Sequence, residues 1–235
     1  MTSKYRLYSF FSSSCAHRII IAAHLKGIPL EFSYVDLRTG EQRGDAYKQA
    51  ANPFGTVPTL VVSEAGAEAD LVIRQSTTAL EYLEEQFPGK TPLLPPPSDP
   101  VGRALVRDFT NLVTNDIQPT TNSKIGVRVK QIRDNVEDRN EFMTIVFREG
   151  FTAYEALIQS TRKPGESGRF TVGEAVSMAD VVMVPAVDQA LFYKMDIAAF
   201  APNVMKIYEY LKTEEAFQAA DWRKQGDTPE QFKIV

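Results

Sequence analysis

The sequence predicts a two-part α+β chain, in which a small mixed sheet with helices on both faces is followed by helices alone. Three observations support this fold class. Apolar segments of strand and helix length alternate over residues 1–89. Six of the 14 prolines then fall between residues 88 and 100, a density that no helix or central strand tolerates. Residues 101–225 keep helical periodicity nearly throughout.

The first part has the element order βαβαββα. Its first helix is apolar almost all round, so we expect it to be buried, and Gly27 ends it because glycine suits the left-handed C-cap conformation. The expected elements, in order, are a strand at about 5–10, a helix at 15–26, a strand at 30–37, a short helix at 41–51, a strand pair at 59–62 and 71–73, and a helix at 76–87.

The proline-rich segment divides the chain into a first domain at 1–89, a stiff linker at 90–100 and an all-helical domain at 101–235. In the helical domain, one long helical pattern runs from about 127 to 161. A second helix is expected to begin with a capping box, because Ser177 and Asp180 are three residues apart.

Composition excludes several classes of function. The net charge of −4 argues against nucleic acid as the main partner, and no apolar run is long enough for a membrane helix. The single cysteine permits no internal disulfide and fits a reducing, cytoplasmic compartment. One cysteine and two histidines cannot build an ordinary structural zinc site, so we expect no metal.

The start of the first helix carries Ser12, Ser13, Ser14 and Cys15. A helix start has unpaired N–H groups and about half a positive charge. The hydroxyl groups there can cap the helix or help to hold an anion such as a thiolate. His17, on the same helix, is expected to be structural rather than part of a catalytic triad.

Two further segments suit a peptide-like ligand. Val57-Pro58 stands at a strand entrance, where the peptide bond is either cis, with the Val57 backbone free to pair with an extended ligand, or a plain trans loop bond. Gln75-Ser76 stands at another helix start, where Ser76 either caps the helix or holds a carboxylate.

With these motifs the chain resembles the cytosolic glutathione transferases over nearly its whole length, and within them the zeta class, which includes the maleylacetoacetate isomerases. The motifs more specific to the zeta class are Ser13-Ser14-Cys15 followed by Arg18, Ile117-Gln118-Pro119 and Asp227-Thr228-Pro229. The other matching segments are Leu25-Lys26-Gly27-Ile28, Asn52-Pro53, Val57-Pro58-Thr59-Leu60, Gln75-Ser76, Glu81-Tyr82-Leu83-Glu84-Glu85, Val172-Gly173 and Ser177-Met178-Ala179-Asp180.

The resemblance implies the glutathione transferase architecture, with a thioredoxin-like N-terminal domain that contains a cis-proline and an all-α C-terminal domain. It implies that Ser13 hydrogen-bonds the glutathione sulfur and holds it as a thiolate, with Ser14 and Cys15 beside it. Val57 would pair with the cysteinyl backbone of glutathione across cis-Pro58. The other implied glutathione contacts are Arg18 and Gln42, Gln75 and Ser76 at the γ-glutamyl end, and Gln118 and Asn122 on the helical domain.

The energetics of such a site are reasonable. A thiol with a pKa near 8.5 is only a few per cent ionised at pH 7, and lowering that pKa by roughly two units corresponds to about 2.7 kcal/mol. One or two charge-assisted hydrogen bonds, at about 1.5–3 kcal/mol each, suffice together with the helix dipole.

The resemblance implies an enzyme that isomerises maleylacetoacetate-like substrates, in tyrosine and phenylalanine breakdown, and conjugates glutathione to small electrophiles in detoxification. Two alternatives remain open: a general conjugating enzyme or thiol transferase that uses Cys15, and a non-catalytic glutathione-binding module. His17 replaces the tryptophan common in the family motif, and Phe192 or its neighbour stands where an arginine is expected, which favours a smaller or apolar electrophile. A homodimer is also implied.

Overall fold

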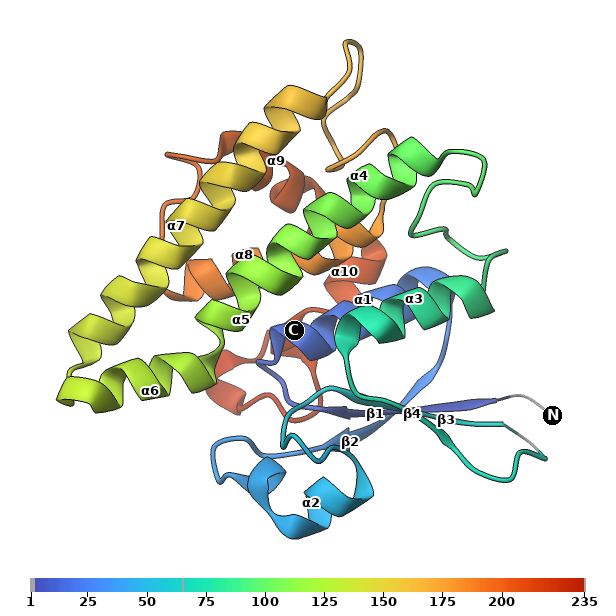
Figure 1. Cartoon of the computed structure of the whole chain (residues 1–235), viewed down its shortest axis with the longest axis vertical. Coiled ribbons are helices and arrows are strands. Elements are labelled where there is room, and N and C mark those ends of the chain that lie inside the picture. Colours follow the sequence, from blue (N-terminus) through green and yellow to red (C-terminus); the bar gives the residue numbers. More distant parts are fainter. Residues whose placement is uncertain (1–2, 65, 235) are drawn as a thin grey trace. The chain divides into compact units, whose positions relative to one another are not determined.

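Figure 1 shows the computed structural model, which describes residues 3–64 and 66–234. The chain forms two compact units. The first contains the residues up to Thr91 together with those from Glu215 onward, and the second contains Pro92–Glu214. This division differs at the C-terminal end from the expected helical domain at 101–235, because the tail packs on the first unit.

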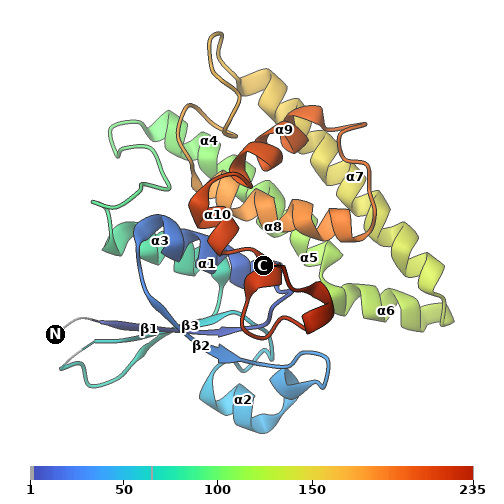
Figure 2. The ribbon, with the colours of Figure 1, turned by 180° about the vertical axis from the view of Figure 1, so that it is seen from behind.

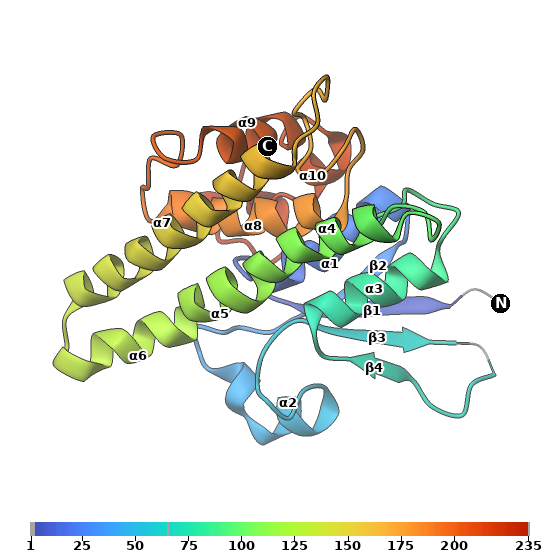
Figure 3. The same ribbon diagram turned by 45° about the horizontal axis from the view of Figure 1, so that its top comes forward.

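The first unit contains a four-stranded sheet in the order β2-β1-β3-β4. β1 and β2 are parallel, and the other neighbours are antiparallel. In Figure 3, α1 and α3 lie on one face of the sheet and α2 lies on the other, which confirms the predicted mixed sheet. The elements are β1 (Lys4–Ser9), α1 (Ser14–Lys26), β2 (Leu30–Tyr34), η1 (Glu41–Arg43), α2 (Asp45–Ala50), β3 (Thr59–Ser63), β4 (Leu71–Ile73) and α3 (Ser76–Gln86).

α1 and α3 are tied together by a buried ion pair. Lys26 is 1% exposed, and its Nζ lies 2.7 Å from Oε2 of Glu84 on α3. The same ammonium donates to the carbonyl of Thr91 at 3.0 Å. Gly27 ends α1 with a φ of 63°, as its residue type predicts. The end of α1 is therefore fixed to α3 and to the segment that leaves the first unit.

The sheet register brings three loops to one edge. Tyr8, near the end of β1, pairs with Thr59, the first residue of β3. Leu60, the next residue of β3, pairs with Ile73, the last residue of β4. The segment after β1, the segment before β3 and the segment after β4 therefore leave the sheet at the same edge, as the antiparallel pairing requires.

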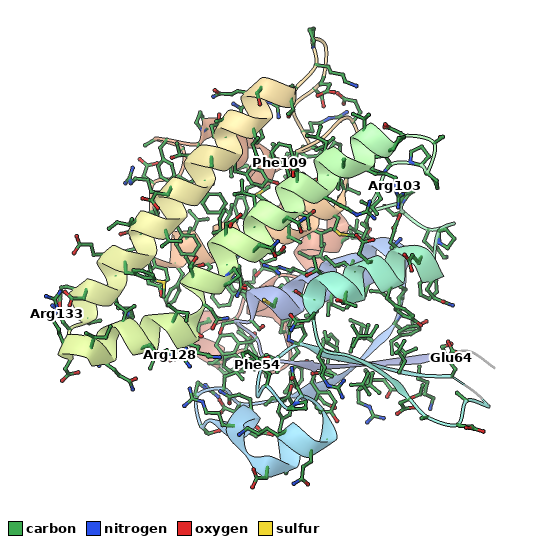
Figure 4. All side chains as sticks on the ribbon, viewed as in Figure 1. Phe54, Glu64, Arg103, Phe109, Arg128 and Arg133 are labelled. Carbon is green, nitrogen blue, oxygen red and sulfur yellow. The ribbon has the colours of Figure 1, made fainter. Side chains whose placement is uncertain are left out.

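The second unit is built from helices in its described residues. Phe109 is fully buried on α4, and its ring centroid lies 4.8 Å from that of Tyr154 on α7; Figure 4 labels Phe109. The elements are α4 (Pro100–Asn111), the π-helical segment η2 (Leu112–Ile117), α5 (Gln118–Thr121), α6 (Ser123–Arg133), α7 (Val136–Thr161), α8 (Met178–Phe192) and α9 (Pro202–Leu211).

The long helical pattern at 127–161 is interrupted in the structure. Asp134 adopts a left-handed conformation with a φ of 47° and ends α6. Asn135 then caps α7, because its side chain accepts from the N–H of Glu137. Aspartate and asparagine adopt this conformation more readily than other side chains, so the turn costs little. The apolar pattern continued through this break and concealed it.

The predicted capping box at the start of α8 is confirmed. Asp180 is fully buried and accepts from the N–H of Ser177 at 2.8 Å and from its hydroxyl at 2.9 Å. Its other oxygen accepts from the N–H of Thr171 at 2.8 Å. The box therefore also fixes the loop that precedes α8.

The C-terminal tail contains α10 (Glu215–Ala219), η3 (Trp222–Lys224) and η4 (Glu230–Phe232). Phe217 of α10 is 2% exposed. Figure 2 shows the tail, in red, beside the start of α1. Among the described residues, no helix is both long and apolar enough to cross a membrane.

Candidate active site

Ser13 is the N-cap of α1. Its backbone is extended, with φ −79° and ψ 102°, and its Oγ accepts from the N–H of Ala16 at 3.2 Å. A hydroxyl has one proton and two lone pairs, so Ser13 can cap the helix and still donate its proton to an acceptor outside. The two functions that the sequence left open are therefore compatible.

The first turn of α1 favours an anion. Ser14 and Cys15 are half-buried, and a helix start leaves their N–H groups without intrahelical partners. The first turn contains no acidic residue, so no carboxylate there competes for the positive end of the helix dipole.

The Val57-Pro58 peptide bond is cis, which selects one of the two alternatives left open by the sequence. Val57 precedes β3 and lies outside the ladder that pairs β3 with β1. It belongs to the same buried cluster as Phe10 and Phe11, the residues that lead to Ser13. The structure thus places the cis turn and the start of α1 next to each other.

The loop before the cis bond is held by hydrogen bonds to the Thr56 carbonyl. Asn52 Nδ2 donates to this oxygen at 3.0 Å, and the Tyr47 hydroxyl donates to it at 2.8 Å. Asn52 Oδ1 also accepts from the N–H of Phe54 at 3.0 Å. These contacts fix the backbone that presents Val57, and the sequence analysis did not identify Tyr47.

Ser76 is the first residue of α3, and Gln75 occupies the N-cap position without a side-chain capping bond. The Ser76 Oγ accepts instead from Nη1 of Arg18 at 3.1 Å. Arg18 is 2% exposed, and its Nε and Nη2 have no acceptor among the described residues. A buried guanidinium with one neutral partner favours a carboxylate nearby. The capping role left open for Ser76 is therefore not the one observed.

Gln42 is 8% exposed and lies on η1, and its Oε1 has no donor among the described residues. η1 packs on the loop before the cis bond, since a Cβ at Gly55 would lie 2.8 Å from the Gln42 carbonyl oxygen. This places Gln42 beside the loop that presents Val57.

The two candidate residues of the helical unit lie one turn apart. Gln118 begins α5 and is 7% exposed. Asn122 caps α6, with its Oδ1 accepting from the N–H of Lys124 at 3.0 Å. Their contribution to a ligand site stays a prediction.

The model of the glutathione S-transferase N-terminal domain matches residues 12–86, a range that contains every candidate residue of the first unit. A probable glutathione S-transferase of Coccidioides immitis is 43% identical over 99% of both chains. The maleylacetoacetate isomerase maiA of Aspergillus fumigatus is 40% identical, over 98% of this chain and 96% of its own. The chain belongs to the glutathione transferase family.

Solved structures place this transferase near the zeta class. The maleylacetoacetate isomerase of Anaeromyxobacter dehalogenans, crystallised with glutathione in its active site, has a TM-score of 0.84 at 32% identity, covering 97% of this chain and 99% of its own. A bacterial maleylpyruvate isomerase of the zeta class has a TM-score of 0.85 at 32% identity, covering 95% and 100%. The expected family resemblance and fold class are confirmed.

The structure also describes His17 and Phe192, which the sequence analysis took as departures from the family pattern. His17 is 4% exposed on α1. Phe192, the last residue of α8, is 68% exposed. Its ring lies edge-on to the ring of Tyr193, with 5.9 Å between the two ring centroids. Arg128, Lys130 and Arg133 of α6 are exposed, whereas Lys124 is half-buried. Arg133, labelled with Arg128 in Figure 4, pairs with Asp138 at 2.7 Å.

One contact near the start of α1 was not predicted. In this transferase, Oδ2 of Asp227 accepts from the N–H of Phe11 at 2.8 Å across 216 residues of sequence. The Asp-Thr-Pro segment of the tail was noted only as part of the resemblance. No periodicity or spacing links it to the start of α1.

Proposed function

We propose that this chain is a glutathione-dependent enzyme of the zeta type that isomerises a cis double bond in maleylacetoacetate-like substrates and conjugates small electrophiles. Glutathione as the cofactor and the assignment as an enzyme are supported by the family match and by neighbours crystallised with glutathione. The observation that carries the proposal is Ser13, whose hydroxyl caps α1 while its proton stays available beside the cis turn.

The residues of the first unit fit glutathione. Glutathione, when bound, supplies the sulfur nucleophile that adds to an activated carbon. Ser13 donates its hydroxyl proton toward the sulfur, and the N–H groups at the start of α1 favour the anion. Val57 offers backbone groups outside the sheet ladder to the cysteinyl segment. Ser76, with its Oγ already accepting from Arg18, has its own proton free to donate to the γ-glutamyl carboxylate.

Gln75 and Gln42 complete the proposed cofactor contacts of the first unit. The Gln75 side chain makes no capping bond and is exposed, so it is available to a ligand. If Phe192 or its neighbour stands where the family has an arginine, no positive charge there meets a substrate carboxylate, which favours a smaller or apolar electrophile.

Variants at Ser13 and Cys15 separate the two catalytic alternatives. Glycine keeps most of the capping stability of serine, whereas alanine costs about 1 kcal/mol. We therefore expect Ser13→Gly to fold normally and to lose about 10²-fold in kcat/KM, the effect of removing one donor to a developing charge. Cys15→Ala should retain most of the activity. The reverse pattern would identify a thiol transferase that uses Cys15 itself.

The substrate class is tested by assaying maleylacetone, dichloroacetate and chlorodinitrobenzene with and without glutathione. Glutathione-dependent cis–trans conversion of maleylacetone supports the isomerase. Conjugation of chlorodinitrobenzene without that conversion indicates a general transferase. Binding of glutathione without turnover of any of the three compounds indicates a binding module.

We further propose that the enzyme is a cytoplasmic homodimer. The single cysteine of the chain suits a reducing compartment. Light scattering of the purified protein would detect a particle of twice the 26.3 kDa chain mass, and a monomer at working concentrations would contradict the dimer.

A further inference from the structure

Two hydrogen bonds fix the backbone of the turn that leads to Ser13. The N–H of Ser13 donates to the carbonyl of Phe10 at 2.9 Å, which closes a four-residue turn over Phe10–Ser13. Inside this turn, the N–H of Phe11 donates to Oδ2 of Asp227 at 2.8 Å. A carboxylate from the far end of the chain therefore fixes the backbone two residues before the N-cap of α1.

The tail that carries Asp227 is held by its own hydrogen bonds. Gln225 Nε2 donates to the carbonyl of Asp221 at 3.0 Å, and the Thr228 hydroxyl donates to the carbonyl of Trp222 at 2.6 Å. Of the four residues that form these two bonds, Asp221, Gln225 and Thr228 are buried and Trp222 is half-buried. Asp227 is thus presented from a folded segment and not from a loose end.

The tail is also fastened to the first unit on both sides of Asp227. The N–H of Gly226 donates to the Tyr34 hydroxyl at 3.1 Å, and a Cβ at Gly226 would lie only 2.6 Å from that oxygen. The rings of Trp222 and Phe232 pack on the ring of Phe11, with centroids 6.2 and 6.3 Å away. These contacts on both sides place the carboxylate of Asp227 on the turn.

The carboxylate of Asp227 is electrostatically unfavourable in this place. Burial raises the pKa of Asp227 above its usual value, and the charge of Asp36 acts in the same direction, while the Phe11 N–H and the charge of Arg38 oppose it. The other oxygen, Oδ1, is buried without a donor among the described residues. A negative charge near the start of α1 also disfavours a second anion there. The hydrogen bond that Asp227 accepts from the Phe11 N–H is the contact that offsets these costs.

We propose that Asp227 is a positioning residue, which holds the Phe10–Ser13 turn so that the Ser13 hydroxyl meets the sulfur of the cofactor. The inference rests on the proposed function of Ser13. Asp227 itself touches neither the sulfur nor the substrate in this scheme. It acts through the backbone of Phe11, and the C-terminal tail becomes part of the thiolate site.

The test compares the pKa of the glutathione thiol bound to the wild type with that bound to Asp227→Ala and Asp227→Asn, by ultraviolet titration of the thiolate. Loss of the charge alone lowers the thiol pKa in both variants. Loss of positioning raises it in Asp227→Ala by about one unit, the equivalent of part of a charge-assisted hydrogen bond. Asp227→Asn keeps an acceptor for Phe11 and should not raise it.

Glu230→Gln removes an exposed carboxylate from the same tail and is the matched control, which should leave the thiol pKa unchanged. Binding of S-methylglutathione, which has no thiol, should change less than about two-fold in Asp227→Ala if the rest of the site is intact. Hydrogen exchange of the segment 10–16 without ligand should rise in Asp227→Ala and not in Glu230→Gln.

A thiol pKa that is unchanged or lowered in Asp227→Ala overturns the inference. If Asp227→Ala does not fold, Asp227→Leu replaces it, because leucine fills the space of the carboxylate and offers no acceptor to the Phe11 N–H: a raised thiol pKa supports positioning, and an unchanged or lowered one overturns it. If the wild type binds neither glutathione nor S-methylglutathione, the proposed function fails, and that outcome is distinct from the failure of Asp227 alone.

Discussion

Arg18 and Ser76 form a buried contact in the first unit at which we propose that an anionic ligand binds. The guanidinium is buried and has one neutral acceptor, the Ser76 hydroxyl at 3.1 Å. A charge in this environment is costly in the free protein and is compensated when a carboxylate binds nearby. We therefore expect Arg18 to contribute more to ligand binding than to folding.

Replacing Arg18 separates these two contributions. In Arg18→Met, the affinity for glutathione should fall about 10-fold or more, since a hydrogen bond to a charged group contributes about 1.5–3 kcal/mol. The melting temperature without ligand should not fall, because methionine fills the space without a buried charge. Calorimetry and thermal unfolding check the two effects, and a large drop in melting temperature with unchanged affinity would show a structural role.

The residues that could be predicted are those whose neighbours in sequence define them. Ser13 is followed by an apolar helix, and Val57-Pro58 precedes a strand, so the capping position and the turn were both expected. The local sequence left the isomer of the Val57-Pro58 bond open, and the cis form that the family resemblance implied is confirmed. The Arg18–Ser76 bond and the Asp227–Phe11 bond depend on segments that meet only in the folded chain. Sequence spacing contains no information on such meetings.

At the scale of elements, the start of α8 depends on Asp180. Asp180→Ala leaves the buried N–H groups of Ser177 and Thr171 without acceptors, and each unsatisfied group costs about 1–3 kcal/mol. We expect the free energy of unfolding to fall by about 2–4 kcal/mol. Urea unfolding measures it, with exposed Asp196→Ala as the control that should change little.

Asp180 also predicts a pH dependence. Burial raises the pKa of Asp180 above its usual value of 3.8, despite the hydrogen bonds that oppose the shift. As pH rises, the unfolded chain therefore loses this proton before the folded protein does. The contribution of Asp180 to the free energy of unfolding should fall from pH 4 up to its raised pKa and stay level above it. Wild type minus Asp180→Asn should show this decline, and a difference that grows with pH would contradict it.

The buried ion pair between Lys26 and Glu84 joins the helices α1 and α3. Lys26→Met leaves Glu84 buried without its ammonium partner, so the free energy of unfolding should fall by about 3–5 kcal/mol. The double variant Lys26→Met, Glu84→Leu should recover most of the loss, because it removes both charges. Chemical denaturation of the three proteins tests this, and an equally unstable double variant would refute it.

Element types followed from periodicity, whereas some boundaries did not. The break between α6 and α7 falls at Asp134, within a continuous apolar pattern. Aspartate and asparagine also occur at many positions that are not helix ends. Neither Asp134 nor Asn135 by itself therefore identified the break.

At the scale of the whole molecule, the chain returns to its first unit after Glu214. The sequence suggested a single helical domain to the end, because α10 continues the helical pattern. The return is driven by burial of Phe217 and by the aromatic contacts of Trp222 with Phe11, which no local pattern reveals.

Removal of the residues from Glu215 onward should therefore affect the first unit. Hydrogen exchange should increase in α1 and in the segment before it, while α7 and α8 keep their protection. Mass spectrometry of exchanged peptides checks this outcome. Loss of protection confined to α7 and α8 would show that the tail belongs energetically to the helical unit instead.

The central claim is that the start of α1, with the hydroxyl of Ser13, holds the cofactor sulfur as an anion. The most direct measurement is the pKa of the glutathione thiol bound to the wild type and to Ser13→Gly. We predict that the pKa of the bound thiol lies roughly two units below the free value near 8.5, and that much of this shift is lost in Ser13→Gly. A bound thiol no more acidic than in buffer, or equally acidic in both proteins, would contradict it.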